Sequence, residues 1–410
     1  MRIVSFGCTG YKPFRGHIDI AMCPLTVFIG RNNSGKTAAL RLPRLLLRAL
    51  SAHRRSGFPL DVDDLTFGET FRDLVHQRFV HGHIDVSIAL EDQGQQFAVE
   101  GTVQNIAEST PAPGVGAEYQ VVSKFRLEHP AVRLEWDGKR GRPPSYKDAG
   151  QFEFRGLLPD ARGDGRQQAA LFEDWSQRIR DFEDGVSHLS AHRQPIRGSY
   201  ERGTPRLISL DGGGAPEWLA ESSELLETAG DWYERNMDGW RLSLDNAAGV
   251  FRCVLRRGGV EVNLSDAGDG MQQLLPVVVQ QLLHACRDLP AFLDLVEEPE
   301  LHLHPAAHAP LADLFLRTAA SGKGQILVET HSENLLLRLR RRIAEGADPG
   351  LVAVYWIEDK ADGSSAVRPI QILSDGEVDY WPEGVFSEGY QEVRALRRAA
   401  RTHVDTTSAS

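Results

Sequence analysis

Eight consecutive residues carry the most readily interpreted chemistry of this chain: Gly30-Arg31-Asn32-Asn33-Ser34-Gly35-Lys36-Thr37. They fit the pattern G-x-x-x-x-G-K-[ST], in which glycines let consecutive backbone N–H groups point inward and surround phosphates. Lys36 can then reach the β- and γ-phosphates, and the Thr37 hydroxyl can hold Mg²⁺. Apolar stretches at 24–29 and 38–50 predict the strand and the helix that must flank this loop. A glycine-rich turn before a core helix is the alternative, but the combination predicts a nucleoside triphosphate site.

A pair of carboxylates follows a second apolar stretch, at 292–296. Glu297 and Glu298 stand at the carboxyl end of this predicted strand, where α/β sheets bind ligands. We expect Glu297 to support Mg²⁺ through water and Glu298 to polarise the attacking water. The alternative is a helix start, with Pro299 in the first turn and the acids complementing the helix dipole. Asp294, inside the strand, has no predicted role.

Two further segments could contact a γ-phosphate. A turn rich in serine and glycine, at 264–270, opens a predicted helix whose free N–H groups suit a phosphate, with Ser265, Gly268 and Gly270 as the candidates. An ordinary strand-to-helix loop would use the same residue types. His331 follows another predicted buried strand and can hydrogen-bond a γ-phosphate, although a lone histidine is usually structural.

Three histidines after the acidic pair suggest a metal site at first: His302, His304 and His308. However, their alternation with leucine and the following Pro305 are typical of a turn, and no acid or cysteine is spaced to complete a ligand set. We therefore expect a turn that shapes a nucleotide interface.

Composition limits the class of protein. A net charge of −11 over 410 residues argues against a protein that coats nucleic acid over its whole surface. The sequence contains no apolar run long enough to span a membrane and no secretory signal, and its four cysteines are scattered. We expect a cytoplasmic protein with reduced thiols.

The pattern of apolar residues predicts five regions. They are an ATPase lobe with the phosphate loop and a β subdomain (1–165), a helical arm (166–250), a second ATPase lobe (251–345), a β extension (346–397) and a disordered tail (398–410). Alternation predicts half-exposed strands at 83–90 and 120–136, and helical spacing is found at 167–184, 215–237, 271–286 and 333–344.

These motifs, in this order, resemble the ABC/SMC-type ATPase heads of the overcoming-lysogeny-defect (OLD) branch of bacterial AAA-family ATPases. The resembling pieces are 1–35, 188–200, 264–276, 297–305, 329–332 and 371–386. The resemblance implies an α/β P-loop NTPase fold: an ABC-ATPase-like two-lobed head with a helical arm and a small C-terminal β extension. It also implies ATP and Mg²⁺ as cofactors, and a homodimer that encloses two ATP molecules.

In such a dimer, one chain would contribute Gly30 to Thr37, Glu297, Glu298 and His331 to each site. Ser265, Gly268 and Gly270 would come from the other chain. Heads of this kind also use a glutamine to link the nucleotide to the arm. We do not identify it here, and the segment Phe67-Gly68-Glu69 is where it would fall.

Full-length OLD proteins carry a C-terminal Toprim nuclease domain, but the stretch after His331 is short and has no acidic D-x-D constellation. Glu358 and Asp359 are expected in a solvated turn. The resemblance therefore favours an ATP-hydrolysing switch for a separately encoded effector, such as a nuclease, in anti-phage defence.

Two other functions compete with the switch. A DNA-repair or DNA-tethering ATPase could bind duplex phosphates through Arg338, Arg340, Arg341 and Arg342, although cations near a helix C-terminus also complement its dipole. A small-molecule kinase or GTPase would share the phosphate loop. It would not need the serine-glycine turn or the glutamate pair, and no N-K-x-D motif for base recognition is present.

Overall fold

The computed structural model describes residues 1–51, 57–107, 118–137, 153–160, 166–204, 207–247, 249–286, 291–382 and 395–396. The loop expected at 109–117, most of the stretch at 137–165 and the tail at 398–410 lie outside these residues.

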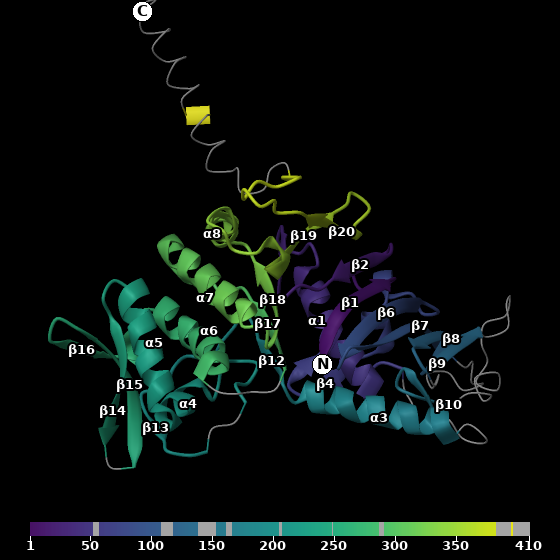
Figure 1. Ribbon diagram of the computed structural model, residues 1–410, viewed down its shortest axis with the longest axis horizontal. Coiled ribbons are helices and arrows are strands. Elements are labelled where there is room, and N and C mark those ends of the chain that lie inside the picture. Colours follow the sequence, from purple (N-terminus) through teal and green to yellow (C-terminus); the bar gives the residue numbers. More distant parts are fainter. Residues whose placement is uncertain are drawn as a thin grey trace, which may run out of the picture.

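A six-stranded sheet at the centre of the molecule carries the phosphate loop (Figure 1). Its strand order is β12-β17-β18-β3-β19-β20, and the first five strands are parallel. The bounds are β3 (Leu25–Gly30), β12 (Val186–Leu189), β17 (Phe292–Glu297), β18 (Gly324–Thr330), β19 (Val352–Asp359) and β20 (Ser365–Ile370). The inner strands are buried on both faces, which explains why they read as nearly continuous apolar runs.

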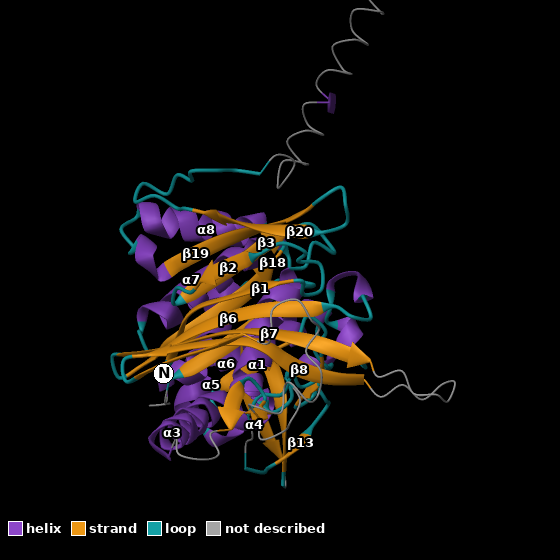
Figure 2. Cartoon of the chain, turned by 90° about the vertical axis from the view of Figure 1, so that its right-hand side faces the viewer, coloured by secondary structure: helices purple, strands orange, loops and turns teal. Residues whose placement is uncertain are grey.

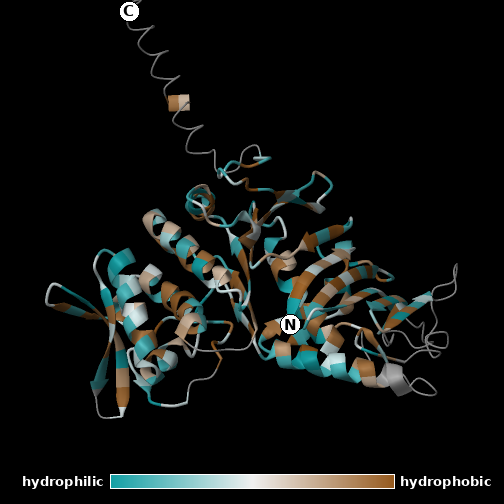
Figure 3. Cartoon of the chain, viewed as in Figure 1, coloured by the Kyte–Doolittle hydropathy of each residue, from teal (hydrophilic) through white to brown (hydrophobic). Residues whose placement is uncertain are grey.

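One face of the central sheet packs against α1 (Lys36–Ser51), which begins at the phosphate loop. Beyond α1 lie α3 (Arg166–Glu183) and an antiparallel sheet of order β2-β1-β6-β7-β8-β9. The strands of this sheet are β1 (Arg2–Thr9), β2 (Ile18–Ala21), β6 (His83–Asp92), β7 (Gln95–Ala107), β8 (Glu118–His129) and β9 (Val132–Asp137). Brown and teal alternate along them, because one side of each strand faces the core (Figure 3). Two small ladders join β4 (Asp61–Val62) to β5 (Leu65–Thr66) and β10 (Glu153–Arg155) to β11 (Leu158–Asp160).

The other face of the central sheet is covered by helices that share a second core. They are α4 (Ala215–Glu221), α5 (Ser223–Asn236), α6 (Asp269–Cys286), α7 (His308–Ala320) and α8 (Glu333–Ala344). A smaller antiparallel sheet flanks α4 and α5, made of β13 (Tyr200–Glu201), β14 (Arg241–Ala247), β15 (Val250–Arg257) and β16 (Val260–Asn263). Figure 2 shows the same layers from the side of the antiparallel sheet. No described helix is long and apolar enough to cross a bilayer.

Two expected regions differ from the structure. The stretch at 166–250 is not an all-helical arm: it contains β12, β13 and β14 as well as three helices, and α3 belongs to a different core from α4 and α5. The strands at 351–370 are not a separate extension either, because β19 pairs in parallel with β3 inside the central sheet. The apolar run of β19 is buried on both faces, as expected of an inner strand rather than an outer hairpin.

Candidate nucleotide-binding site

The phosphate loop joins β3 to α1, as predicted. Two of its positions must be glycine because neighbouring atoms leave no room for a Cβ. A Cβ on Gly30 would lie 2.6 Å from the carbonyl oxygen of Ile357. Gly35 has φ of 102°, and a Cβ there would lie 2.5 Å from Cγ of Pro13. Side chains at either position would therefore clash with the strand or loop beside it.

Lys36 and Thr37 begin α1 and point into the loop region. Nζ of Lys36 donates to the carbonyl oxygens of Gly30 (3.2 Å) and Arg31 (2.8 Å), and burial lowers the pKa of this lysine. Ser34 is fully buried, and its Oγ has no hydrogen-bond partner in the part of the chain that the structure describes. An anion in the loop would favour the charged form of Lys36 and could accept from Ser34.

A cavity of about 530 Å³ opens beside this loop. Asn32, Asn33 and residues 35–37 of the loop line part of it, together with Arg41 and Glu329. The cavity is also lined by Tyr11, Lys12, Asp359 and Lys360. The turn expected at Glu358 and Asp359 is wrong, because both residues lie in β19 and pair with β20. Asp359 and Lys360 are exposed, and they border the cavity, which the sequence did not indicate. Lys12 donates from Nζ to the carbonyl oxygen of Phe67 (2.9 Å), which places the predicted arm-linking segment next to the cavity wall.

Glu329 is the site residue that sequence reasoning missed. It lies in β18, the strand directly beside β3, and its Oε1 accepts a hydrogen bond from Oγ1 of Thr37 at 3.0 Å. Nζ of Lys36 lies 3.9 Å from the same oxygen. Burial raises the pKa of Glu329 to about 7, although Thr37 and Lys36 oppose this shift. Its Oε2 is buried and has no hydrogen-bond partner among the described residues. The sequence did contain a signal for Glu329, because it is an acid near the end of the predicted buried strand that precedes His331.

Glu297, one strand farther from β3, is bound on both oxygens. Nε and Nη2 of Arg41 donate to Oε1 (2.6 Å) and Oε2 (2.9 Å), and Nε2 of His188 donates to Oε1 at 2.8 Å. Nδ1 of the neutral His188 accepts from Arg44 at 3.2 Å, which fixes the ring tautomer. Burial alone would raise the pKa of Glu297, but the bonds from His188 and Arg41 outweigh it and lower this pKa to about 2. Glu297 was predicted to support Mg²⁺. In the structure, its carboxylate already accepts three hydrogen bonds from protein side chains.

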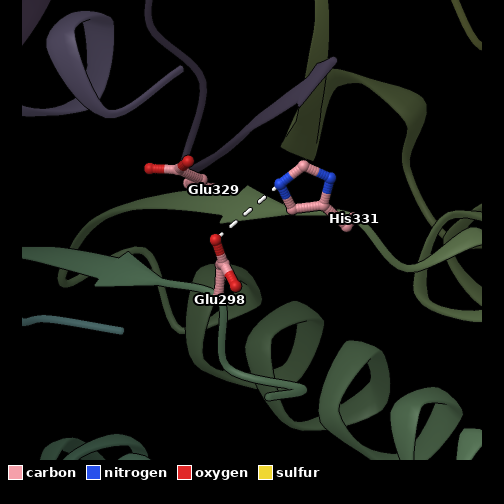
Figure 4. A group of neighbouring side chains, drawn as sticks. All are labelled: Glu298, Glu329 and His331. Carbon is pink, nitrogen blue, oxygen red and sulfur yellow. Dashed lines mark ion pairs between the residues drawn. The ribbon is translucent and has the colours of Figure 1, made fainter. Parts of the chain in front are cut away.

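Glu298 and His331 lie close to Glu329, although neither of them lines the cavity. Oε1 of Glu298 is 3.7 Å from Nε2 of His331 (Figure 4). Each of Glu298, Glu329 and His331 offers one ligand atom, and these atoms lie within 4.8 Å of one another. Glu298 has a φ of 41°, a left-handed conformation that is uncommon outside glycine, and its backbone N–H donates to the carbonyl oxygen of Glu329 (2.8 Å). The turn after β17 is therefore held against the end of β18.

The residues after the glutamate pair shape the loop that carries His331. Glu300 is buried, and its Oε1 accepts from Oγ1 of Thr330 and from the backbone N–H of His331, each at 2.7 Å. Nδ1 of His308 accepts from Oγ of Ser332 (2.7 Å).

The histidines 302, 304 and 308 form no metal-binding group in the described residues. His304 instead caps the short helix at 305–307, which fits the predicted turn.

The serine-glycine turn does not reach the cavity of its own chain. Ser265 lies in a 3-10 turn at 264–266, and Gly268 precedes α6; neither lines the cavity. A Cβ on Gly268 would meet nothing within 4 Å, whereas one on Gly270 would lie 2.5 Å from the carbonyl oxygen of His302. Gly270 is therefore small because it packs against the backbone at His302, whereas Gly268 is exposed and Ser265 is half-buried.

Arg193 connects α6, the helix after the serine-glycine turn, to the acidic pair. The sequence pointed to its segment, 188–200, only through the family resemblance. Nη2 of Arg193 donates to the carbonyl oxygen of Glu297 (2.7 Å). Its backbone N–H donates to Gln273 Oε1 (3.2 Å), and Gln273 Nε2 donates to the Arg193 carbonyl oxygen (2.8 Å). Asp294 makes a second link, because its Oδ2 accepts from Gln281 and His284 of α6, each at 2.8 Å. Two sets of hydrogen bonds therefore tie α6 to β17.

The basic patch on α8 is engaged within the chain. Arg338 and Arg342 pair with Asp313, Arg341 pairs with Glu345, and Arg340 donates to the carbonyl oxygen of Gly376. These contacts favour the structural interpretation of the four arginines over a free surface for duplex phosphates.

Comparison with known proteins gives a family match over part of the chain. Residues 165–338 match the family described as "AAA domain, putative AbiEii toxin, Type IV TA system". This region holds the serine-glycine turn, the glutamate pair and His331, but not the phosphate loop. No curated protein matches the chain.

Similar solved structures include an SMC head domain from Thermotoga maritima, with 14% identity, TM-score 0.44, and coverage of 91% of this chain and 100% of that one. An SMC head bound to the C-terminal winged-helix domain of ScpA has 13% identity, TM-score 0.47, and coverage of 91% and 99%. An SMC head with an extended coiled coil, bound to the C-terminal domain of ScpA derived from Pyrococcus furiosus, has 11% identity, TM-score 0.44, and coverage of 97% and 99%.

The predicted fold class is confirmed: the chain is an α/β P-loop NTPase with an ABC-ATPase-like head. At such identities and scores the assignment rests on this molecule's own strand order. The phosphate-loop strand β3 and the acidic strand β17 are separated by one strand, β18, which ends beside His331.

Proposed function

We propose that this chain is an ATP-binding and ATP-hydrolysing head that dimerises around two ATP molecules and switches a separately encoded effector. The proposal rests on one observation, which is that side chains from several elements meet at one place. Lys36 and Thr37 of the phosphate loop meet Glu329, Glu298 and His331 at the carboxyl edge of the central parallel sheet. Ligands bind at this edge in α/β sheets.

The side chains divide the chemistry between them. Lys36 would bind the β- and γ-phosphates, and Ser34 would donate to a phosphate oxygen. Glu298 would orient and polarise the attacking water, and His331 would hydrogen-bond the γ-phosphate and respond to its loss. Mg²⁺ fits this donor set, because Thr37, Glu298 and Glu329 offer oxygen atoms and Oε2 of Glu329 is buried without a partner among the described residues. When bound, the cation would neutralise charge on the phosphates.

The dimer is supported by the separation, within one chain, of the phosphate-loop cavity from the serine-glycine turn. Among the described residues, none of the serine-glycine turn lines the cavity beside the phosphate loop; Gly268 is exposed and Ser265 is half-buried. A second copy of the chain could bring that turn to the γ-phosphate. The bonds of Arg193 and Asp294 to α6 would then link closure of the dimer to the strand that carries Glu298.

The effector part of the proposal rests on the partial family match and on the sequence resemblance, so it is the less direct step. An anti-phage role, with a nuclease or another toxic protein as the effector, is the form that the resemblance favours.

Calorimetry with a non-hydrolysable ATP analogue tests the central step. We expect the parental chain to bind the analogue and Lys36→Ala to lose binding, because the lysine charge faces the phosphates. Parental binding no stronger than that of Lys36→Ala would refute the proposal.

The shared site is tested separately by Ser265→Arg, which should abolish hydrolysis and block the ATP-dependent dimer measured by light scattering. Ser223→Arg, at an exposed serine that begins α5, is the matched control and should leave both intact. Unchanged hydrolysis in Ser265→Arg would show that the site is not shared between subunits.

A further inference from the structure

His331 lies in a two-residue connection between β18 and α8, beyond the ends of the strand ladders. β18 ends at Thr330, and α8 begins at Glu333. The pairing of β18 with β17 ends at Glu329, and its pairing with β3 ends at Thr330. The backbone N–H of His331 therefore has no acceptor from a neighbouring strand and needs one from elsewhere.

Glu300 supplies that acceptor. Its Oε1 accepts from the backbone N–H of His331 and from Oγ1 of Thr330, each at 2.7 Å. Oγ1 of Thr330 in turn accepts from the backbone N–H of Ser332 at 2.9 Å. Glu300, Thr330 and Ser332 are all buried, so water competes little for these bonds. The backbone on both sides of His331 is therefore fixed by bonds that start from one buried carboxylate oxygen.

The other end of the connection is also held. Oγ of Ser332 accepts from the backbone N–H of Leu335 at 3.0 Å and so caps α8, and it donates to Nδ1 of His308 at 2.7 Å. The ring of His331 instead faces Glu298, with its Nε2 at 3.7 Å from Oε1 of that residue (Figure 4). The backbone of the connection is thus anchored, while the imidazole faces the proposed reaction site.

Glu300 belongs to the same turn as Glu298, directly after β17. Two bonds hold this turn against the end of β18: the backbone N–H of Glu298 donates to the carbonyl oxygen of Glu329, and Glu300 accepts from His331. The turn that presents Glu298 therefore also fixes His331. The separation of these two side chains depends on the bond that Glu300 makes.

We propose that Glu300, acting with Thr330, is a positioning residue that holds His331 opposite Glu298 and so sets the rate of the hydrolytic step. This inference rests on the proposed ATP function and deepens it, because it concerns the reaction at that same site. Glu300 does not line the cavity beside the phosphate loop. Its contribution is the acceptor at Oε1, and not contact with the nucleotide.

Steady-state ATP hydrolysis by the full chain tests the role of the acceptor. Glu300→Met keeps a side chain of similar length without an acceptor, so kcat should fall by about tenfold or more, because small displacements of a reacting group are costly. KM for ATP should change by less than about threefold, since the phosphate loop is untouched. Glu300→Gln keeps an oxygen acceptor and should recover most of the lost rate. Glu358→Met, at an exposed acid of β19, is the matched control and should leave both constants unchanged.

A double-mutant cycle separates the positioning of His331 from a general structural role. In a chain that already carries His331→Ala, Glu300→Met should change the remaining single-turnover rate by less than about threefold, because the side chain that it positions is gone. Thr330→Val removes the hydroxyl and keeps the shape, so it should lower kcat in the parental chain and add little to Glu300→Met. Circular dichroism establishes that each variant is folded, and Thr330→Val takes the place of Glu300→Met in the cycle if the latter does not fold.

An equal loss of rate from Glu300→Met in the parental and His331→Ala chains would overturn the inference, as would a Glu300→Gln variant as slow as Glu300→Met. In either case hydrolysis by the parental chain would still support the ATP function. A parental chain that neither binds nor hydrolyses ATP would instead remove the proposed function and this inference together.

Discussion

Glu297 ends β17, and Glu329 lies directly opposite it in β18; both are acids at the end of a buried parallel strand, and both residues are 4% exposed. Their pKa values nevertheless move in opposite directions. Burial raises the pKa of Glu329 to about 7, whereas hydrogen bonds from His188 and Arg41 overcome burial and lower that of Glu297 to about 2. Burial alone therefore does not decide the charge of a strand-end acid, because the number of donors around it does.

The comparison also separates an acid that already accepts three hydrogen bonds from acids with fewer partners. Three donors make Glu297 part of the packing between α1, β12 and β17. Glu329 has one hydroxyl donor and a distant ammonium, and Glu298 has a histidine at 3.7 Å. Of these acids with fewer partners, Glu329 lines the cavity and Glu298 lies close to Glu329.

The largest expected effect concerns the third acid of this edge. Glu298→Gln should lower the rate of ATP hydrolysis by about 10²- to 10⁴-fold, because it removes the group that polarises water. Binding of ATP should persist, and a dimer should accumulate that light scattering can detect. Hydrolysis at the parental rate would move the general base to another of the three carboxylates.

Stability should distinguish the two buried acids next. Glu297→Gln leaves Arg41 and the ring of His188 without their charged acceptor, so we expect a loss of about 3 kcal/mol in the free energy of unfolding. Glu329→Gln, measured in EDTA at the same pH, should lose little or gain stability. Urea denaturation followed by circular dichroism measures both, and equal losses would show that the two environments are equivalent.

The dependence of stability on pH should also have opposite signs. A carboxylate with a lowered pKa stabilises the fold above its unfolded pKa, and Glu297 loses this contribution as pH falls toward 2. Glu329 has a raised pKa, so the fold is favoured while it is protonated, and stability falls by about 1–3 kcal/mol as pH rises through about 7. In metal-free buffer, the stability difference between Glu329→Gln and the parental chain should grow from about pH 5 to about pH 8.5. A difference that stays constant over this range would contradict the assigned protonation.

The smallest expected effect is at Asp359, which also lines the cavity. Asp359 is an exposed acid, so Asp359→Asn should change affinity for the ATP analogue by less than about threefold, and salt should remove most of that change. Calorimetry at two salt concentrations provides the measurement. A large, salt-resistant change would mean that Asp359 contacts the nucleotide directly.

Several parts of the fold could be predicted because their signals are local. Helix α8 begins and ends where helical spacing placed it, at Glu333 and Ala344, and β6 follows the alternation found at 83–90. The role of β19 was missed because a run of apolar residues does not say which strand lies beside it. The helical arm was wrong for a similar reason: short strands such as β12 carry too few residues to show a period.

The sequence by itself indicated the phosphate loop, the acidic pair at the end of β17 and the histidine after β18, since each is a run of neighbouring residues with its own chemical pattern. Only the tertiary structure decided which acid meets the Thr37 hydroxyl and which meets a guanidinium. That choice depends on where α1 crosses the sheet and on His188 from β12, a residue more than a hundred positions away from Glu297. Local patterns place a carboxylate at the end of a strand, but its charge and its partners come from elements that the chain brings there by folding.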